Sequence, residues 1–437
     1  MAIEYLKKAT KKPTTGEDQT RDTVSGILKD IEEFGEKKAI EYGIKLDGWD
    51  GDIIVSKDAI EESATKVTQQ LKDDLQFAFD RVYGFARKQM ESIQEFDVEL
   101  SPGLWAGQKL IPMNTAGCYV PGGRYAHVAS AIMSIATAKA AGVENIVTCS
   151  TPKKEHGGIH PAILYTMDLC GADHILAMGG VQGIAAMAFG LFTGCRADIL
   201  VGPGNKYVAE AKRMLFGRVG IDLFAGPTEI LIIADETADP EIVAVDLVGQ
   251  AEHGIDSPAW FITTNRDFAN KVMDRMQPLI EALPDVQREA AHNAWRDFGE
   301  VVLCDTDEEA AKVSDQYAPE HLEVQTKNLD WYTNRLKNYG SLFVGEETTV
   351  AFGDKCSGTN HILPTKEAGR YTGGLSVHKF IKIVTTQRAT QEANRDVAAI
   401  TARISRLEGM EAHARTGDIR LAKYFPDETF TLQANES

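Results

Sequence analysis

The chain has 437 residues, 43% of them hydrophobic and 25% charged, an ordinary globular composition that suggests roughly two or three domains. The formal net charge of −18 argues against general nucleic-acid binding, because phosphate contacts need a basic face. It leaves room for an anionic small molecule in a local cationic pocket. The six cysteines include no CxxC pair, and the N-terminus has no apolar signal core, so we expect buried thiols in a soluble, cytoplasmic protein without a membrane span.

The N-terminal part of the chain predicts helices and little chemistry. Residues 1–20 are polar and Lys/Thr-rich, and we expect an arm without a core of its own. Residues 22–42 have a helical pattern, residues 53–55 suit a short strand, and Ser56 is placed to cap a helical stretch over 57–94.

Between residues 116 and 229 the chain alternates short apolar runs, glycine-containing turns and Ala-rich helices. This spacing predicts a parallel α/β sheet, in which ligands bind at the carboxyl ends of the strands. The turns at Gly122-Gly123, Gly179-Gly180 and Gly202-Pro-Gly204 do not have the dinucleotide-binding GxGxxG spacing. Each allows close backbone approach at a helix N-terminus, which favours an anion, but each is equally needed to route chain from strand to helix.

A second set of strands and helices follows, and we assign residues 21–115 plus 230–375 to one discontinuous α/β domain, with 116–229 as the other. Residues 376–437 form a separate, helical C-terminal segment. In it Val397, Ile400, Ile404 and Leu407 recur at helical spacing, so this stripe must dock on its own chain or on a partner.

A helix capped by Asp239, with Pro240 at its first position, leads to Gln250 and His253. These two residues are three apart, so on a continuing helix they share one face, before Gly254 ends it. An amide oxygen and an imidazole are half of a metal shell that would suit zinc. A histidine on the surface, or one with a partner in the core, is the more common explanation of such spacing.

Two further polar groups could carry chemistry. Glu320 and His321 are adjacent, and on a loop both could reach one cleft, where an imidazole suits proton transfer and a carboxylate can activate water. Asp354 and His361 lie in a glycine-rich polar segment that a solvated turn would explain only in part. The alternative for the first pair is a helix-start carboxylate beside a surface histidine.

Taken together, the motifs of this chain resemble those of the histidinol dehydrogenase family, in the same order and over nearly the whole chain. The motifs that carry the resemblance are Tyr119-Val-Pro-Gly-Gly123, Gly180-Val-Gln-Gly-Ile-Ala-Ala, Val201-Gly-Pro-Gly-Asn-Lys-Tyr-Val208, Ala225-Gly-Pro-Thr-Glu, Gln250-Ala-Glu-His-Gly, Ala318-Pro-Glu-His-Leu, Gly353-Asp, Ser357-Gly-Thr-Asn-His-Ile-Leu-Pro-Thr365 and Leu407-Glu-Gly through His413.

The resemblance implies two Rossmann-like parallel-sheet units in an intertwined homodimer, with residues 116–229 as the NAD-binding domain. It implies a primary alcohol oxidised to an acid in two NAD-dependent steps through a retained aldehyde. His321 would be the general base for the alcohol, and Glu320 with His321 would activate water in the second step. The implied contacts are Gln250, His253, Asp354 and the partner subunit's His413 for zinc, Tyr119, Gln182 and Asn205 for NAD, and Thr228, His361 and Glu408 for substrate, with Glu408 also reaching across the dimer.

The departures from the family pattern concern the substrate. Where histidinol-type members have Pro-Ser-Ser after the Pro-Gly-Gly turn, this chain has Arg124-Tyr-Ala-His127, and Lys355 replaces the usual Tyr after Asp354. His378 and Lys379 stand in another family segment that usually carries an Asp, and Thr228 replaces a Ser. Added cations disfavour a cationic amino alcohol and favour a sulfonate or carboxylate.

This pattern resembles the sulfopropanediol dehydrogenase branch, which oxidises the C3 alcohol of 2,3-dihydroxypropane-1-sulfonate to sulfolactate. We expect Arg124 and His127, with His378 or Lys379, to receive the sulfonate, although each could be an ordinary surface cation. Histidinol oxidation is the alternative within the family. A zinc hydrolase without NAD would use Glu320 and His321 but leave the glycine turns without a purpose. Stabilisation of the protein by NAD would separate these classes.

Overall fold

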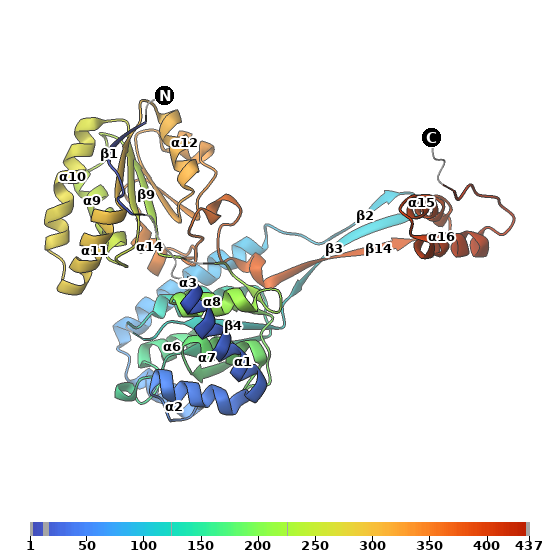
Figure 1. The fold of residues 1–437 in the computed structure, drawn as a ribbon, viewed down its shortest axis with the longest axis horizontal. Helices are drawn as coiled ribbons and strands as arrows, with labels where there is room; N and C mark the ends of the chain where they lie inside the picture. Colours follow the sequence, from blue (N-terminus) through green and yellow to red (C-terminus); the bar gives the residue numbers. More distant parts are fainter. Residues whose placement is uncertain (1–2, 12–16, 124, 225, 434–437) are drawn as a thin grey trace. The chain divides into compact units, whose positions relative to one another are not determined.

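The computed structural model describes residues 3–11, 17–123, 125–224 and 226–433. The chain divides into two compact units, Met1–Met90 with Pro112–Phe380 and Glu91–Ile111 with Ile381–Ser437. In the described residues, the strands form two larger sheets in the first unit and one small sheet in the second (Figure 1). The helices of these residues include none that is long and apolar enough to cross a membrane.

The first of the larger sheets, called here the β4 sheet, confirms the parallel α/β prediction for residues 116–229. Its strand order is β6-β5-β4-β7-β8 and every pair is parallel. The strands are β4 (Thr115–Val120), β5 (Asn145–Ser150), β6 (His174–Ala177), β7 (Ile199–Val201) and β8 (Gly220–Ile221). The helices between them are α4 (Val128–Ala131) and α5 (Thr137–Ala140), which a π-helical turn joins, α6 (Pro161–Leu169), α7 (Gly180–Phe189) and α8 (Lys206–Leu215).

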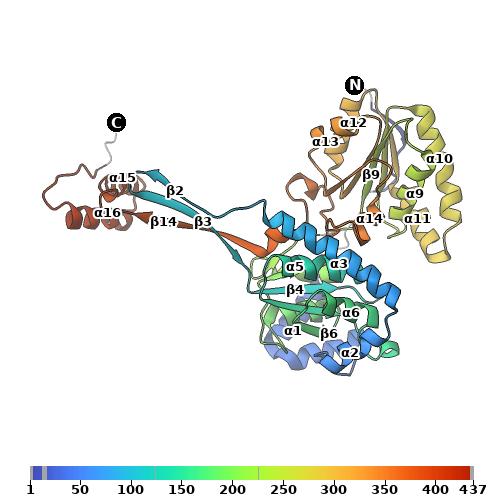
Figure 2. The same ribbon diagram turned by 180° about the vertical axis from the view of Figure 1, so that it is seen from behind.

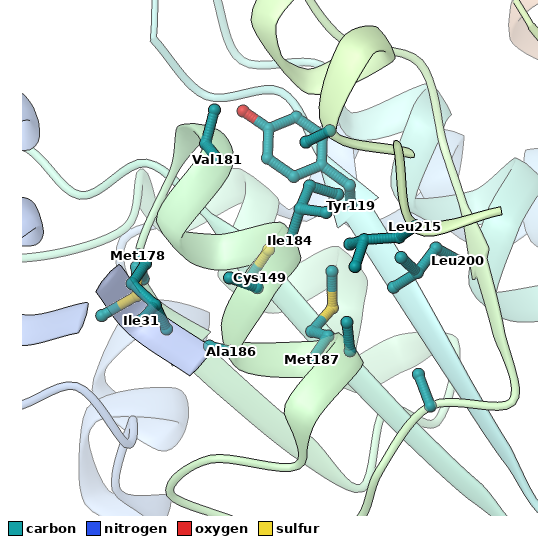
Figure 3. Packing of buried hydrophobic residues seen from close by; sticks show 14 of the residues in the cluster. Ile31, Tyr119, Cys149, Met178, Val181, Ile184, Ala186, Met187, Leu200 and Leu215 are labelled. Atoms are coloured by element: carbon teal, nitrogen blue, oxygen red, sulfur yellow. The ribbon is translucent and has the colours of Figure 1, made fainter. Parts of the chain in front are cut away.

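The N-terminal helices pack on the β4 sheet and not, as we expected, with residues 230–375. They are α1 (Glu17–Tyr42), α2 (Lys57–Thr65) and α3 (Gln69–Met90), and Ser56 caps α2 as predicted. Ile31 of α1 joins Met178, Ile184 and Met187 in one buried cluster (Figure 3). An apolar stripe shows that a helix docks but not on which of two apolar surfaces, so the domain assignment of residues 21–90 was wrong.

The second larger sheet, the β9 sheet, has the order β1-β11-β10-β9-β12-β13. All its pairs are parallel except β1 with β11. The strands are β1 (Glu4–Lys7), β9 (Ile230–Ala234), β10 (Ala259–Thr263), β11 (Glu300–Leu303), β12 (His321–Gln325) and β13 (Ser341–Val344). The helices are α9 (Pro240–Ala251), α10 (Arg266–Glu281), α11 (Asp285–Phe298), α12 (Asp307–Tyr317), α13 (Leu329–Arg335) and α14 (Val350–Lys355).

Three predictions for this part of the chain need correction. The N-terminal arm contributes a strand, since β1 pairs with β11 through main-chain hydrogen bonds. His321 begins strand β12 instead of lying on a loop; the sequence hid this strand because it alternates polar with apolar residues and buries both. Asp239 does cap α9, but the helix ends at Ala251, so His253 lies just beyond it.

The second unit contains strands as well as the predicted C-terminal helices. Its sheet has the order β14-β3-β2, with β14 at Ile381–Ala389, β3 at Leu104–Pro112 and β2 at Phe96–Ser101. Helices α15 (Asn394–Leu407) and α16 (Glu411–Tyr424) pack side by side (Figure 2). Residues 91–111 therefore belong with the C-terminal segment and not with the domain to which we assigned them. On α15, Ile400, Ile404 and Leu407 are 46%, 52% and 68% exposed.

Candidate active site

A pocket of ≈ 490 Å³ in the first unit is lined by residues of both larger sheets. The β4 sheet supplies residues that follow its strands, such as Gly122 after β4, Thr151 after β5 and Gly202 after β7. The β9 sheet supplies residues at the beginnings of its strands, including Thr228 before β9 and His321 at the start of β12. The pocket therefore lies at the carboxyl ends of the β4 sheet, where we expected a ligand, and at the amino ends of the β9 sheet.

On the β4 side, the turn after β7 has a fixed backbone. Gly202 has φ +113°, and a Cβ there would lie 2.1 Å from the Tyr119 carbonyl oxygen, so the position requires glycine. The Gly202 N–H donates to Asp222 Oδ2 at 2.8 Å, and the Lys212 ammonium donates to the Gly202 carbonyl at 2.9 Å. Lys212 and Asp222 are buried and form an ion pair with each other. This pair holds the turn that carries Asn205 into the pocket lining.

At two of the three glycine turns, those before α7 and α8, side chains of the protein itself accept hydrogen bonds from the turn or from the helix N-terminus. Asn205 Oδ1 accepts hydrogen bonds from the N–H groups of Tyr207 and Val208, in the first turn of α8. At the start of α7, the Asp47 carboxylate accepts from the Gly179 N–H and from the Gln182 side chain, both at 2.9 Å. Of the two interpretations of these turns, anion binding or a plain strand-to-helix connection, these contacts favour the second at α7 and α8.

The three residues expected to contact NAD differ in their positions. Tyr119 and Asn205 line the pocket, whereas Gln182 is not among its lining residues. Gln182 is buried, and its Oε1 has no hydrogen-bond partner among the described residues. Tyr119 sits at the edge of the apolar cluster of the β4 sheet (Figure 3), and its hydroxyl accepts from the Gly180 N–H at 3.3 Å.

On the β9 side, a chain of hydrogen bonds joins Gln250 to Glu320. The Gln250 Nε2 donates to Thr228 Oγ1 at 2.5 Å, and Thr228 Oγ1 donates to Glu320 Oε2 at 2.6 Å. Glu320 Oε2 also accepts from the Glu229 N–H at 3.0 Å. Glu320 is 6% exposed, and burial raises the pKa of its carboxyl to about 8 despite these hydrogen bonds.

The environment of His321 determines which of its ring nitrogens can act as a base. Nδ1 lies 2.8 Å from the Glu229 carbonyl oxygen, which can only accept, so Nδ1 carries the hydrogen. Nε2 is then unprotonated, because burial lowers the pKa of this imidazole. Nε2 is buried without a hydrogen-bond partner among the described residues, and Asp354 Oδ1 lies 3.9 Å away. A buried base faces the pocket.

Of the four expected zinc ligands, His253 and Asp354 line the pocket, and Gln250 contacts Thr228 in its wall. Because the Gln250 side-chain nitrogen donates a hydrogen bond to Thr228, the side-chain oxygen is the atom that can bind a metal. His413 lies on α16 and Glu408 at the end of α15, both in the second unit. Among the residues described, no group of three or more His, Cys, Asp or Glu side chains is gathered closely enough to hold a metal ion.

The cations expected to receive an anion are only partly brought together. His127 lines the pocket, and so does His361, which we expected to contact the substrate. Lys355 also lines it, a residue that departs from the family motif but that we did not place in the site. His378 and Lys379 lie in the turn Val377–Phe380 and are absent from the described lining. Arg124 lies outside the described residues.

The basic side chains of the pocket influence one another. Partial desolvation and the nearby charge of Lys355 lower the pKa of His127, with smaller contributions from other histidines. His361 is oriented by its own contacts, since its Nδ1 lies 2.9 Å from the Asp354 carbonyl oxygen and its Nε2 lies 3.3 Å from Ser130 Oγ. The pocket thus combines a buried acid–base pair with the Lys355 ammonium and two imidazoles whose pKa values lie below the usual range.

Comparison with known proteins identifies the family. The model of the family described as histidinol dehydrogenase matches residues 10–421. The chain belongs to the histidinol dehydrogenase family. A crystal structure of histidinol dehydrogenase from Elizabethkingia anophelis has a TM-score of 0.88 at 34% identity and covers 95% of both chains. The α/β fold with parallel sheets is therefore that of the family.

Two relatives within the histidinol dehydrogenase family are still more similar in sequence. A histidinol dehydrogenase homolog of Pelagibacter ubique is 64% identical over 425 residues, covering 97% of this chain and 99% of the relative. A sulfopropanediol 3-dehydrogenase of Ruegeria pomeroyi is 57% identical over 435 residues and covers both chains completely.

Sequence reasoning missed the residues that support this site from behind. Asp47 and the Lys212–Asp222 pair carry no motif of their own, and their roles depend on contacts over long sequence separations. Lys355 did have a signal, because it stands directly after Asp354 where the family usually has an uncharged ring.

Proposed function

We propose that this member of the histidinol dehydrogenase family is a zinc-dependent, NAD-linked dehydrogenase that oxidises the C3 alcohol of 2,3-dihydroxypropane-1-sulfonate to sulfolactate through an aldehyde. The observation that carries the substrate assignment is the presence of His127 and Lys355 together in the pocket lining. A sulfonate bound between them would accept a charge-assisted hydrogen bond from Lys355 and would favour protonation of His127, whereas a cationic amino alcohol would be repelled by Lys355. The 57% identity to a sulfopropanediol 3-dehydrogenase supports the same choice.

The donor set around the pocket fits zinc and a dinucleotide. Gln250, His253 and Asp354 would provide an amide oxygen, an imidazole and a carboxylate, with His413 and Glu408 contributed by the second copy of a homodimer. Tyr119 and Asn205, with Gln182, would receive the cofactor on the β4 side. Zinc would hold and orient the reacting hydroxyl, and NAD would accept the hydride.

His321 would act in the first oxidation as the general base. Its Nδ1–H remains bonded to the Glu229 carbonyl, so the unprotonated Nε2 is the atom that takes the alcohol proton. Burial favours the neutral imidazole before the transfer. The neighbouring Asp354 carboxylate favours the charged ring after it, and Thr228 and His361 in the wall would orient the substrate.

Glu320 would act in the second oxidation, together with His321. The two side chains lie 3.5 Å apart, so they can share the work of removing a proton from the water that adds to the aldehyde. The Thr228 hydroxyl and the Glu229 N–H hold the carboxylate in place. Because the pKa of Glu320 is about 8, its active, ionised form becomes abundant only in mildly alkaline solution.

The homodimer is part of the proposal. The exposed Ile400, Ile404 and Leu407 form an apolar stripe on α15 that a second copy would cover. His413 and Glu408 lie on the same two helices, so docking of these helices on a partner would bring both side chains to the partner's pocket.

The test is NADH production by the zinc-loaded protein with dihydroxypropanesulfonate and with L-histidinol, side by side. We expect turnover of the sulfonate, with two NADH per molecule, and none of histidinol. Turnover of histidinol alone would mean that the basic side chains of the pocket do not select an anion. No stabilisation by NAD and no NADH from either alcohol would contradict the dehydrogenase assignment and favour a hydrolase.

A further inference from the structure

Two carboxyl groups of the β9 sheet region share one hydrogen-bond donor, the side-chain amide of Gln325. Glu323 is fully buried in β12, and the half-buried Asp246 faces it from α9. In the described parts of the chain no basic side chain lies at ion-pair distance from either group. The neighbours of Glu323 in the sheet, Ile232 on β9 and Phe343 on β13, are apolar. Neither carboxylate therefore has a cation that could neutralise it.

The hydrogen bonds of this pair come from three neighbouring groups. The Gln325 Nε2 donates to Asp246 Oδ2 at 3.1 Å and to Glu323 Oε2 at 3.0 Å. The Val350 N–H donates to Glu323 Oε1 at 3.0 Å, and the Thr349 hydroxyl donates to Asp246 Oδ1 at 2.9 Å. The pair thus connects α9, β12 and the start of α14.

Burial without a cation favours one retained proton on this pair. Two ionised carboxylates around one neutral amide donor would repel each other, and in a buried site water would not screen that repulsion. Burial, with the charge of Asp246, raises the pKa of Glu323 to about 8, and burial also raises the pKa of Asp246. One of the two is therefore neutral at pH 7.

The three segments that contact this pair, α9, β12 and α14, each carry a residue of the proposed active site. That residue lies one helix turn, or one two-residue strand repeat, from the contact. Gln250 follows Asp246 by four residues on α9, which places both on one face of the helix. His321 precedes Glu323 by two residues on β12, on the same face of the sheet. Asp354 follows Val350 by four residues on α14. One buried contact thus fixes three segments that end in the pocket.

We propose that Asp246 and Glu323 are positioning residues that hold one proton between them and thereby align Gln250, His321 and Asp354. The inference rests on the proposed function, because it assigns these three residues to zinc binding and base catalysis. The pair itself touches neither substrate nor cofactor. It acts through the helix turns and the strand repeat that separate it from the pocket.

The shared proton makes the arrangement sensitive to alkaline pH. Because the folded-state pKa of Glu323 lies above the value of 4.5 for a free Glu, the folded protein holds a proton that the unfolded chain releases. The contribution of the pair to stability is therefore complete at acidic pH and is lost as the pH rises through about 8. Above that pH two like charges face each other, and the three segments lose their common anchor.

The experiment compares the wild type with Glu323→Gln and Glu323→Leu. The Gln side chain has no proton to lose and can accept from Val350, while Gln325 turns its unpartnered Oε1 to receive the new N–H. The Leu side chain removes all these contacts. Urea unfolding of the metal-free proteins is measured at pH 6 and 9, and zinc affinity is measured at pH 7 and 9.5 by competition with a chromophoric chelator.

We expect the zinc affinity of the wild type to fall about fivefold between pH 7 and 9.5 relative to that of Glu323→Gln. At pH 7, Glu323→Leu should bind zinc roughly tenfold to a hundredfold more weakly than the wild type, with Glu323→Gln close to the wild type. If the Leu variant does not fold, the pH profile of the Gln variant still decides.

Two results would overturn the inference. Identical pH profiles of stability and zinc affinity in the wild type and Glu323→Gln would exclude the shared proton. Unchanged zinc affinity in a folded Glu323→Leu would exclude the positioning role. A wild type that binds no zinc would contradict the proposed function and with it the positioning role, while the urea measurements would still report separately on the proton.

Discussion

The two larger sheets line the pocket with opposite ends of their strands, and the two sides contribute different kinds of groups. The β4 sheet offers the carboxyl ends of its strands, with glycine turns held by main-chain contacts and by the buried Lys212–Asp222 pair. The β9 sheet offers amino ends, where Thr228, Glu320 and His321 present side chains that can move protons. One side provides a shaped backbone surface and the other provides acid–base chemistry.

The connection between the sheets explains why their opposite ends meet. The chain leaves the carboxyl end of β8 at Asp222, and after a short segment it enters the β9 sheet at Thr228. A connection this short cannot travel along the length of a sheet, so it joins the end of one strand to the nearest beginning of another. The contrast predicts that variants on the two sides fail in different ways.

Replacement of His321 should have the largest effect. His321→Gln removes the base while keeping a polar side chain, and we expect kcat to fall roughly 100-fold to 10,000-fold. Stabilisation by NAD should be unchanged, because the cofactor is assigned to the other sheet. Steady-state NADH production and thermal unfolding with NAD measure the two effects. A variant that lost NAD binding together with turnover would argue against the division of tasks.

Disruption of the buried ion pair on the β4 side should reduce stability. Lys212→Met leaves the Asp222 carboxylate buried without its cation, which should cost roughly 3–5 kcal/mol in the free energy of unfolding. Urea unfolding measures this loss, with Lys271→Met on the exposed face of α10 as the control. Equal stabilities of the two variants would mean that the pair does not hold the turn.

Removal of a basic side chain of the pocket should weaken substrate binding alone. His127→Ala should raise the KM for the sulfonate about tenfold with kcat nearly unchanged, since the sulfonate does not react. The control is His292→Ala on the exposed surface of α11. A KM equal to that of the wild type would remove His127 from the substrate site.

The smallest effect concerns pH. Since ionised Glu320 is the active form and its pKa is about 8, oxidation of the aldehyde should accelerate about tenfold between pH 7 and 9. The sign follows from the base role, because raising the pH increases the ionised fraction. Rates measured with added aldehyde test this, and Glu320→Gln should lose the slope. A rate that falls over this range would identify Glu320 as an acid instead.

The sequence predicted the local features of the molecule better than their assembly. Strand and helix positions in residues 116–229 and the Asp239 cap of α9 follow from local patterns and are confirmed. The sequence did not predict strand β12, because its polar residues are buried through contacts with α9 and α14 that no local pattern reveals. It did not predict the packing of α1, because an apolar stripe does not specify its partner.

The same limit applies to the candidate site. Motifs led to Glu320, His321 and Asp354, and the fold brings these side chains close to one another. His378 and Lys379 were chosen because their residue types are unusual, which says nothing about where the chain places them. Supporting residues such as Asp47 and Asp246 become visible only through their hydrogen bonds.

The most direct test of the account is a single-turnover experiment on the zinc-loaded protein with limiting dihydroxypropanesulfonate and excess NAD. We predict two NADH per substrate molecule for the wild type. For Glu320→Gln we predict one NADH in a first phase and a strongly slowed second, because only hydration of the aldehyde needs that carboxylate. Two equally fast phases in the variant, or a single NADH from the wild type, would contradict the assignment of two successive oxidations to the amino ends of the β9 sheet.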